Sequence, residues 1–190
     1  MTGRATESGY FPWLAGMFVI AGIVHIVSVL AMPALATRDA FARLAATTPV
    51  NALALLPDAG PGREIIPFDD AQTAVAICRF DLGGGPLRVR AAVTGDSLLS
   101  LGFHRKHGEV FYAMTDRAAV RGRIDVVVAT AAQIETLEAG DNSDEPVQDL
   151  RLPVADVEGY VVARALAERP GDMARARTQL QSVFCGPDRG

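Results

Sequence analysis

The stretch AVAICRFDLGGGPLRVRAAV, residues Ala74–Val93, contains two apolar segments separated by three glycines and a proline. The segments before and after the glycines, Ala74–Phe80 and Leu87–Val93, are short. Their apolar residues have the spacing of a β-strand and not the period of a helix. Gly83–Pro86 has the composition of a turn. This stretch therefore predicts two strands joined by a turn.

The chain beyond this stretch repeats the same pattern. Arg105–Gly108 is a second turn signal, and it predicts an antiparallel hairpin. Thr130 with Gln133 predicts a capped helix through Leu137, and a final helix is expected from Asp172 to Val183. The further predicted strands are Leu98–His104, Val110–Met114, Ile124–Ala129, Val147–Leu152 and Gly159–Ala165. About seven strands with short helices predict an α+β fold with a mainly antiparallel β domain.

Residues 11–36 form a long uncharged segment near the N-terminus. No Asp, Glu, Lys or Arg occurs between Glu7 and Arg38. Twenty-six residues at about 1.5 Å each exceed the ~30 Å hydrocarbon core of a bilayer. The prediction is one transmembrane helix. A cleaved signal peptide is the alternative, because Ala34–Ala36 has the A-x-A form of a processing site, although the apolar run is long for a signal core.

These patterns divide the chain into four parts. An N-terminal tail, residues 1–10, precedes the transmembrane helix, residues 11–36. A short amphipathic helix at Arg38–Ala46 and a Pro- and Gly-rich stretch at Pro57–Asp70 predict a helix with an irregular linker over residues 37–70. The β-rich domain is expected over residues 71–190.

Charge and cysteine usage bear on location. Arg4 stands before the helix and Arg38 and Arg43 after it, so the positive-inside rule does not decide the orientation. A disulfide between Cys78 and Cys185 would fit an oxidising compartment; two buried free thiols are the alternative. The cysteines therefore favour a protein of the bacterial inner membrane whose C-terminal domain lies in the periplasm. The alternative is a cytoplasmic domain, which the basic residues after the helix would favour.

No residue pattern predicts catalysis, a metal or a cofactor. The basic residues are not clustered in a chain of net charge −4, which argues against nucleic acid. His104 and His107 form an H-x-x-H pair, with Asp116 further along the hairpin, but zinc usually takes three or four ligands, and a pair at a hairpin turn is expected to be solvated. Gly83–Gly85 precedes a strand, whereas a phosphate loop precedes a helix. The carboxylates flanking the first strand, which are Asp69, Asp70 and Asp81, are expected to cap turns or bind arginine.

His25 is the one ionisable residue of the apolar segment. Ala21, His25 and Ser28 are spaced four and three apart and share one helix face. Lipid offers no partner to an imidazole, and small and polar residues mediate helix contacts in membranes. The stripe predicts contact with a partner helix; an imidazole bonded to backbone or water is the alternative.

The chain resembles the family known as domain of unknown function 1254, in its short alphaproteobacterial form with one membrane helix. The segments that carry the resemblance are Asp69–Ala91, Leu98–Ala118, Ile124–Leu137 and Gln179–Cys185, with Ala21–Ile26 and Arg38–Leu44 in the N-terminal part. The resemblance implies an exported β-rich body and offers no catalytic residues. Longer relatives carry a second domain, domain of unknown function 1214, so a short form implies a separate membrane-anchored partner that carries it.

Two functions are therefore expected from the sequence. The first is a non-enzymatic component of a cell-envelope complex, held in the membrane beside that partner. The alternative is an enzyme or ligand-binding module acting on envelope glycan or lipid. Its cleft would be lined by Asp81, His104, Tyr112 and Asp116, and it requires these side chains to converge on one pocket.

Overall fold

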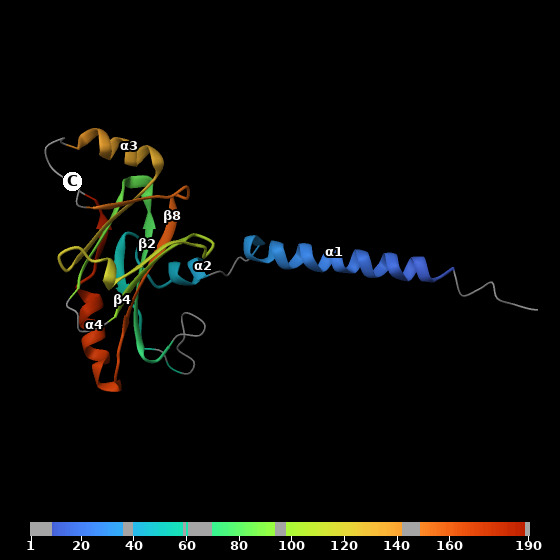
Figure 1. The fold of residues 1–190 in the computed structure, drawn as a ribbon, viewed down its shortest axis with the longest axis horizontal. Coiled ribbons are helices and arrows are strands. Elements are labelled where there is room, and N and C mark those ends of the chain that lie inside the picture. Colours follow the sequence, from blue (N-terminus) through green and yellow to red (C-terminus); the bar gives the residue numbers. More distant parts are fainter. Residues whose placement is uncertain are drawn as a thin grey trace, which may run out of the picture. The chain divides into compact units, whose positions relative to one another are not determined.

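The structure is a computed structural model that describes residues 9–35, 40–58, 60, 70–93, 98–141 and 149–188. The chain divides into two compact units, Met1–Thr37 and Arg38–Gly190 (Figure 1). The first unit contains helix α1 and the second is a β-rich body. The predicted combination of an N-terminal apolar helix with an α+β body is confirmed.

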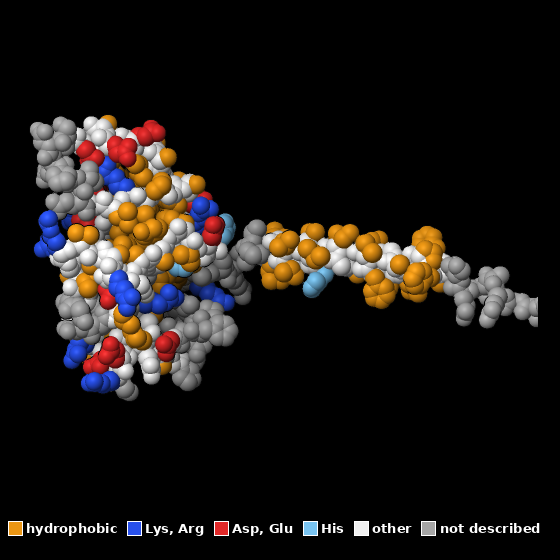
Figure 2. Space-filling model, viewed as in Figure 1, with side chains coloured by type: hydrophobic (Ala, Val, Ile, Leu, Met, Phe, Trp, Pro, Cys, Tyr) orange, Lys and Arg blue, Asp and Glu red, His pale blue; other side chains and the backbone are white. Residues whose placement is uncertain are grey.

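Helix α1 (Phe11–Leu35) is strongly apolar and carries no Asp, Glu, Lys or Arg; its polar side chains are His25 and Ser28. Its segment Phe11–Met32 has 22 residues and a mean hydropathy of 2.4, and none of it is buried. At about 1.5 Å per residue it is long enough to cross a ~30 Å hydrocarbon layer. The visible side of α1 is covered almost entirely by hydrophobic side chains (Figure 2). A helix of this length and composition fits a membrane anchor or a signal sequence.

The described residues of the body form two sheets. The five-stranded sheet has the order β1-β2-β8-β4-β5 and the four-stranded sheet the order β7-β6-β3-β9. All neighbouring strands are antiparallel except the parallel pair β6 and β7. The strands are β1 (Ala52–Leu55), β2 (Thr73–Asp81), β3 (Leu87–Ala92), β4 (Leu99–Arg105), β5 (Val110–Thr115), β6 (Arg123–Ala129), β7 (Leu150–Pro153), β8 (Glu158–Leu166) and β9 (Phe184–Pro187).

The main core lies between the two sheets because alternate residues of their strands point toward each other. Its buried residues include Ala76, Cys78 and Phe80 of β2, Leu99, Leu101 and Phe103 of β4, Val89 of β3, and Val126 and Val128 of β6. Helices α3 (Ala131–Gly140) and α4 (Met173–Gln181) lie at opposite ends of the body (Figure 1). Thr130 and Gln133 form the predicted capping box of α3.

Part of the predicted linker belongs to the body. Helix α2 (Ala40–Ala45) packs Phe41 and Leu44 on the outer face of the five-stranded sheet, against Ile77 and Tyr160. Strand β1 pairs with β2. The β-rich unit therefore begins at Arg38 and not at residue 71, since these segments bury apolar surface on the sheet.

The two predicted turns have different roles. The turn at residues 105–108 joins β4 to β5 in the expected hairpin. The glycine turn instead carries the chain from one sheet to the other, since β2 pairs with β1 and β8 while β3 pairs with β6 and β9. Gly85, at φ +134°, adopts a conformation that other residues rarely take. The Asp81 carboxylate accepts a hydrogen bond from Gly83 N at 2.8 Å and caps this turn.

Candidate functional site

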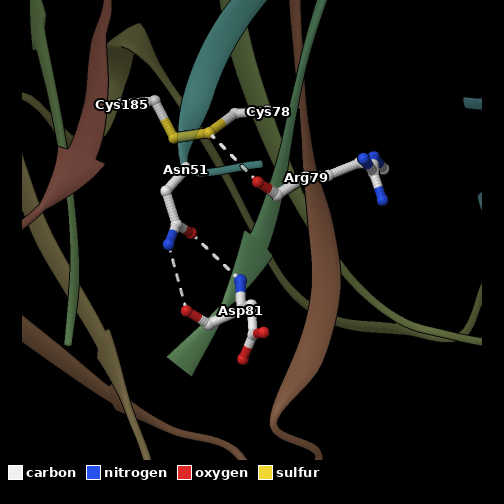
Figure 3. The surroundings of a disulfide bond; sticks show 5 residues. All are labelled: Asn51, Cys78, Arg79, Asp81 and Cys185. Carbon is white, nitrogen blue, oxygen red and sulfur yellow. Dashed lines mark hydrogen bonds between the residues drawn. A yellow bond between two sulfur atoms is a disulfide. The ribbon is translucent and has the colours of Figure 1, made fainter. Parts of the chain in front are cut away.

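The predicted disulfide is confirmed: Cys78 and Cys185 are bonded, with an S–S distance of 2.04 Å (Figure 3). Cys78 lies on β2 and Cys185 on β9, so the bond links the two sheets. Cys78 is fully buried and Cys185 is 6 % exposed. No free cysteine remains in the part of the chain that the structure describes.

Asn51 lies beside the disulfide and extends the pairing of β1 with β2 (Figure 3). Its backbone N–H donates to Arg79 O at 2.7 Å. Its side-chain oxygen accepts from Asp81 N at 3.0 Å, and its side-chain nitrogen donates to Asp81 O at 3.1 Å. The side-chain amide of Asn51 therefore bonds to β2 as the peptide group of a neighbouring strand would. The backbone of Asp81 is bonded to Asn51 and its carboxylate caps the glycine turn, so Asp81 has a structural role.

The four side chains predicted to line a cleft do not converge. His104 lies on the outer face of the five-stranded sheet, directly opposite Tyr160. Tyr112 is paired with Phe103 and packs on the core side, with ring centroids 6.1 Å apart. Asp116 lies in the turn after β5, where its carboxylate accepts from Arg117 N at 3.0 Å. His104 and Tyr112 therefore occupy opposite faces of one sheet, and these residues form no common pocket.

The predicted carboxylate set at the first strand also stays apart. Asp70 accepts hydrogen bonds from Gln72 N at 3.0 Å and from the Thr73 hydroxyl at 3.2 Å, as a turn cap does. Asp69 lies outside the described residues. Within the described ranges, no three His, Cys, Asp or Glu side chains are grouped so that they could hold a metal ion.

The outer face near α2 carries a stack of rings and cations. His104 stacks on Tyr160 at 4.8 Å with an interplanar angle of 5°, and its Nδ1–H donates to Gly108 O at 3.2 Å. Arg79 and Lys106 each lie over the Phe41 ring at 5.5 Å. Cation–π contacts of this kind stabilise by about 0.5–1 kcal/mol when exposed. They hold α2 on the sheet.

Acid should weaken the body through His104. Burial lowers the pKa of its imidazole from the usual 6.5; the bond to Gly108 O acts in the opposite direction, and nearby Arg164 lowers it further. Between the lowered pKa and about 6.5, the unfolded chain binds a proton that the folded chain does not. The free energy of unfolding should therefore fall as the pH drops below about 6.5, by less than ~1.4 kcal/mol per pH unit.

Urea unfolding of the full chain at pH 7 and pH 5 measures this loss. His104→Phe keeps an aromatic ring over Tyr160 and should show a smaller loss than the wild type. Arg164→Gln should raise the pKa of His104, as read by NMR titration. Equal pH dependence in the wild type and His104→Phe would contradict the assignment.

The outer face of the four-stranded sheet carries an ion-pair network that the sequence did not reveal. Arg88 contacts the carboxylates of Asp125 at 2.8 Å, Asp188 at 3.1 Å and Asp149 at 3.4 Å. Burial alone would lower the pKa of Arg88, but hydrogen bonds to Asp125 and Asp188 raise it above its usual value. Arg151 extends the network to Asp149 and, at 2.7 Å, to Asp141.

Two hollows open on this same face, with volumes of about 430 and 400 Å³. The first lies over β9 and is bordered by Asn51, Phe184 and Pro187. The second lies over the ends of β3 and β6 and includes Arg123. Arg90 lines both, and none of the residues predicted for a cleft lines either one.

The residues predicted for helix contact lie on α1. Ala21, His25 and Ser28 are exposed and share one face of the helix. The structure gives the His25 ring no hydrogen-bond partner among the residues that it describes. Their role in contact with a second helix stays a prediction.

No protein-family model and no curated protein matches the chain. The fold is similar to that of the VPA0106 protein from Vibrio parahaemolyticus, with a TM-score of 0.54 and 14 % identity over 78 % of this chain and 34 % of that one. An uncharacterised protein from Burkholderia cenocepacia gives a TM-score of 0.44 and 16 % identity over 64 % of this chain and 33 % of that one. The chain spans about a third of the length of these proteins. At 14 % identity the likeness to the VPA0106 protein concerns the fold alone.

Proposed function

We propose that this chain is a non-enzymatic component of a bacterial envelope complex, held in the inner membrane by α1 with its body in the periplasm. The disulfide supports an oxidising compartment for the body, because such bonds persist outside the reducing cytoplasm. The apolar length of α1 supports a retained anchor, since it exceeds the usual ~7–15-residue core of a signal peptide.

One observation carries the proposed partnership: a fully exposed apolar helix bears an imidazole that has no hydrogen-bond partner among the described residues. In a hydrocarbon layer, a neutral imidazole leaves one donor and one acceptor unsatisfied. The small residue Ala21 and the hydroxyl of Ser28 lie on the same face. A neighbouring helix can approach closely there and bond to the imidazole.

The proposed neighbour is a second membrane-anchored protein that carries domain of unknown function 1214. The resemblance of this chain to the short form of domain of unknown function 1254 supports that choice. The alternative of an enzyme acting on envelope glycan or lipid is not proposed, because it required Asp81, His104, Tyr112 and Asp116 to share a pocket and the structure keeps them apart.

Photo-crosslinking in intact membranes tests the partnership. A photoreactive amino acid at Ala21 or Ser28 should capture a partner, whereas the same group at Ile23 or Leu30 should not, since those residues lie on the opposite helix face. His25→Leu should lower capture from Ser28 by about fivefold or more if the helix contact contributes ~1 kcal/mol.

The matched control is Ile23→Leu, which leaves the polar stripe intact and should not change capture. Equal capture from both faces, or unchanged capture in His25→Leu, would remove the helix contact from the proposal. Protease protection of the body in sealed spheroplasts would contradict its periplasmic location.

A further inference from the structure

Arg90 occupies the centre of a row of side chains on the outer face of the four-stranded sheet. It is paired across the ladder with Phe184 of β9 on one side and with Asp125 of β6 on the other. Residues that face each other in a ladder point to the same side of the sheet, so these three side chains lie next to one another. The row combines an exposed ring, a guanidinium and a carboxylate.

The hydrogen-bonding capacity of Arg90 is largely unused, in contrast to that of Arg88 two residues earlier. Arg88 is 18 % exposed and contacts three carboxylates. Arg90 is 53 % exposed and is bonded only through Nε, to Asp125 at 3.1 Å. Its two terminal nitrogens have no partner among the described residues. They form the planar fork that binds a carboxylate through two parallel hydrogen bonds.

Arg90 lines both hollows, so its unused donors belong to a side chain that the two hollows share. Volumes of about 430 and 400 Å³ fall in the range of about 300–1,000 Å³ that is typical of small-molecule sites. Arg123, which also lines the second hollow, has no ion pair within the described ranges. The donors on this face therefore exceed what the described chain uses.

The first hollow has an apolar wall. Phe184 is 49 % exposed, and its ring lies against Gly186, where a Cβ atom would meet the ring at 3.0 Å. Pro187 and Cys185 continue this wall. A partly exposed aromatic side chain that lines a hollow offers a surface on which an apolar or aromatic group can pack.

We infer that this face binds a small monoanion, a carboxylate attached to a compact apolar or aromatic group. The carboxylate would take the terminal nitrogens of Arg90, and the apolar group would pack on Phe184 in the first hollow. A single negative charge fits better than a doubly charged phosphate, because Asp125 and Asp188 also border the hollows. This site is independent of the partner proposed for α1.

The test is ligand-observed NMR on the full chain in phosphatidylcholine nanodiscs, with empty nanodiscs as the blank. The probe 3-phenylpropionate should bind saturably, and its neutral isostere 3-phenylpropionamide should bind at least tenfold more weakly. Arg90→Gln should weaken the probe by about tenfold to a hundredfold, as loss of a charge-assisted pair does. Phe184→Ala should weaken 3-phenylpropionate but leave the weak binding of acetate unchanged.

Arg117→Gln is the matched control, because Arg117 is exposed and lines neither hollow. It should leave the affinity for 3-phenylpropionate unchanged. Arg90→Lys, which keeps the charge but lacks the fork, should fall between the wild type and Arg90→Gln. Absence of saturable binding of 3-phenylpropionate, or equal affinity for 3-phenylpropionamide, would overturn the inference. Equal losses of affinity in Arg90→Gln and Arg117→Gln would do the same, as would tighter binding of inorganic phosphate than of 3-phenylpropionate.

Discussion

Replacing both Cys78 and Cys185 with alanine is expected to lower the free energy of unfolding of the body by about 4 kcal/mol. The two cysteines are 107 residues apart in sequence, so their bond excludes many extended conformations of the unfolded chain. In the chain-entropy description a loop of about 100 residues contributes ~4–5 kcal/mol. Loss of the bond also removes the covalent link between β9 and β2 across the core. Guanidinium unfolding of the full chain measures the change.

A reductant supplies the control for this prediction. In the wild type, dithiothreitol should shift the unfolding midpoint toward that of the double alanine variant, and it should not shift the variant itself. Equal midpoints for the oxidised wild type and the variant would contradict a stabilising role. Mass spectrometry under non-reducing conditions verifies that the bond is present.

Arg88→Met is expected to destabilise the body by about 3–5 kcal/mol. The substitution leaves the carboxylate of Asp188, which is only 8 % exposed, without the guanidinium that it contacts. Asp149, which is 12 % exposed, loses Arg88 but keeps its contact with Arg151 at 3.5 Å. Removing one partner of a largely buried ion pair costs about this much, because an uncompensated charge stays in a poorly solvated place. Thermal and urea unfolding of the full chain measure the loss.

Arg175→Met is the control for a loose surface pair. Arg175 is 64 % exposed and lies 3.7 Å from Asp172, so its loss should change stability by less than about 1 kcal/mol. Adding Asp188→Asn to Arg88→Met should recover part of the lost stability, since it removes the carboxylate charge that Arg88→Met leaves unpaired. A similar effect of Arg88→Met and Arg175→Met would show that the network contributes little.

Local sequence patterns predicted most of the elements but not their arrangement. The core strands around Ala74–Phe80 and Leu87–Val93 have clear apolar patterns, and the capping box at Thr130 is a short-range signal. A glycine turn, however, looks the same whether it joins two paired strands or carries the chain to another sheet. Strands β1 and β9 have only four residues each, too few for a distinct period, and sequence reasoning missed both.

In the candidate sites, too, sequence reasoning missed what depends on how the strands pair. The partners of the disulfide were predictable because two cysteines allow only one internal pairing, but the sequence left two free thiols open as the alternative. The proposed cleft failed because a bulge in β5 places Phe111 between residues paired with β4, and so decides which face Tyr112 occupies. The Arg88 network was missed because its partners lie 37, 61 and 100 residues away. Only the pairing of the strands brings them together.

The position of Cys185 has a consequence for biogenesis. Strand β9 follows every other described strand in the order of synthesis, yet its sulfur must reach β2 in the middle of the sandwich. The disulfide can therefore close only after Cys185 has been synthesised and has reached Cys78 under oxidising conditions. A stalled or C-terminally clipped polypeptide would therefore expose an unpaired thiol on β2, a signature that thiol-specific labelling of nascent chains would detect.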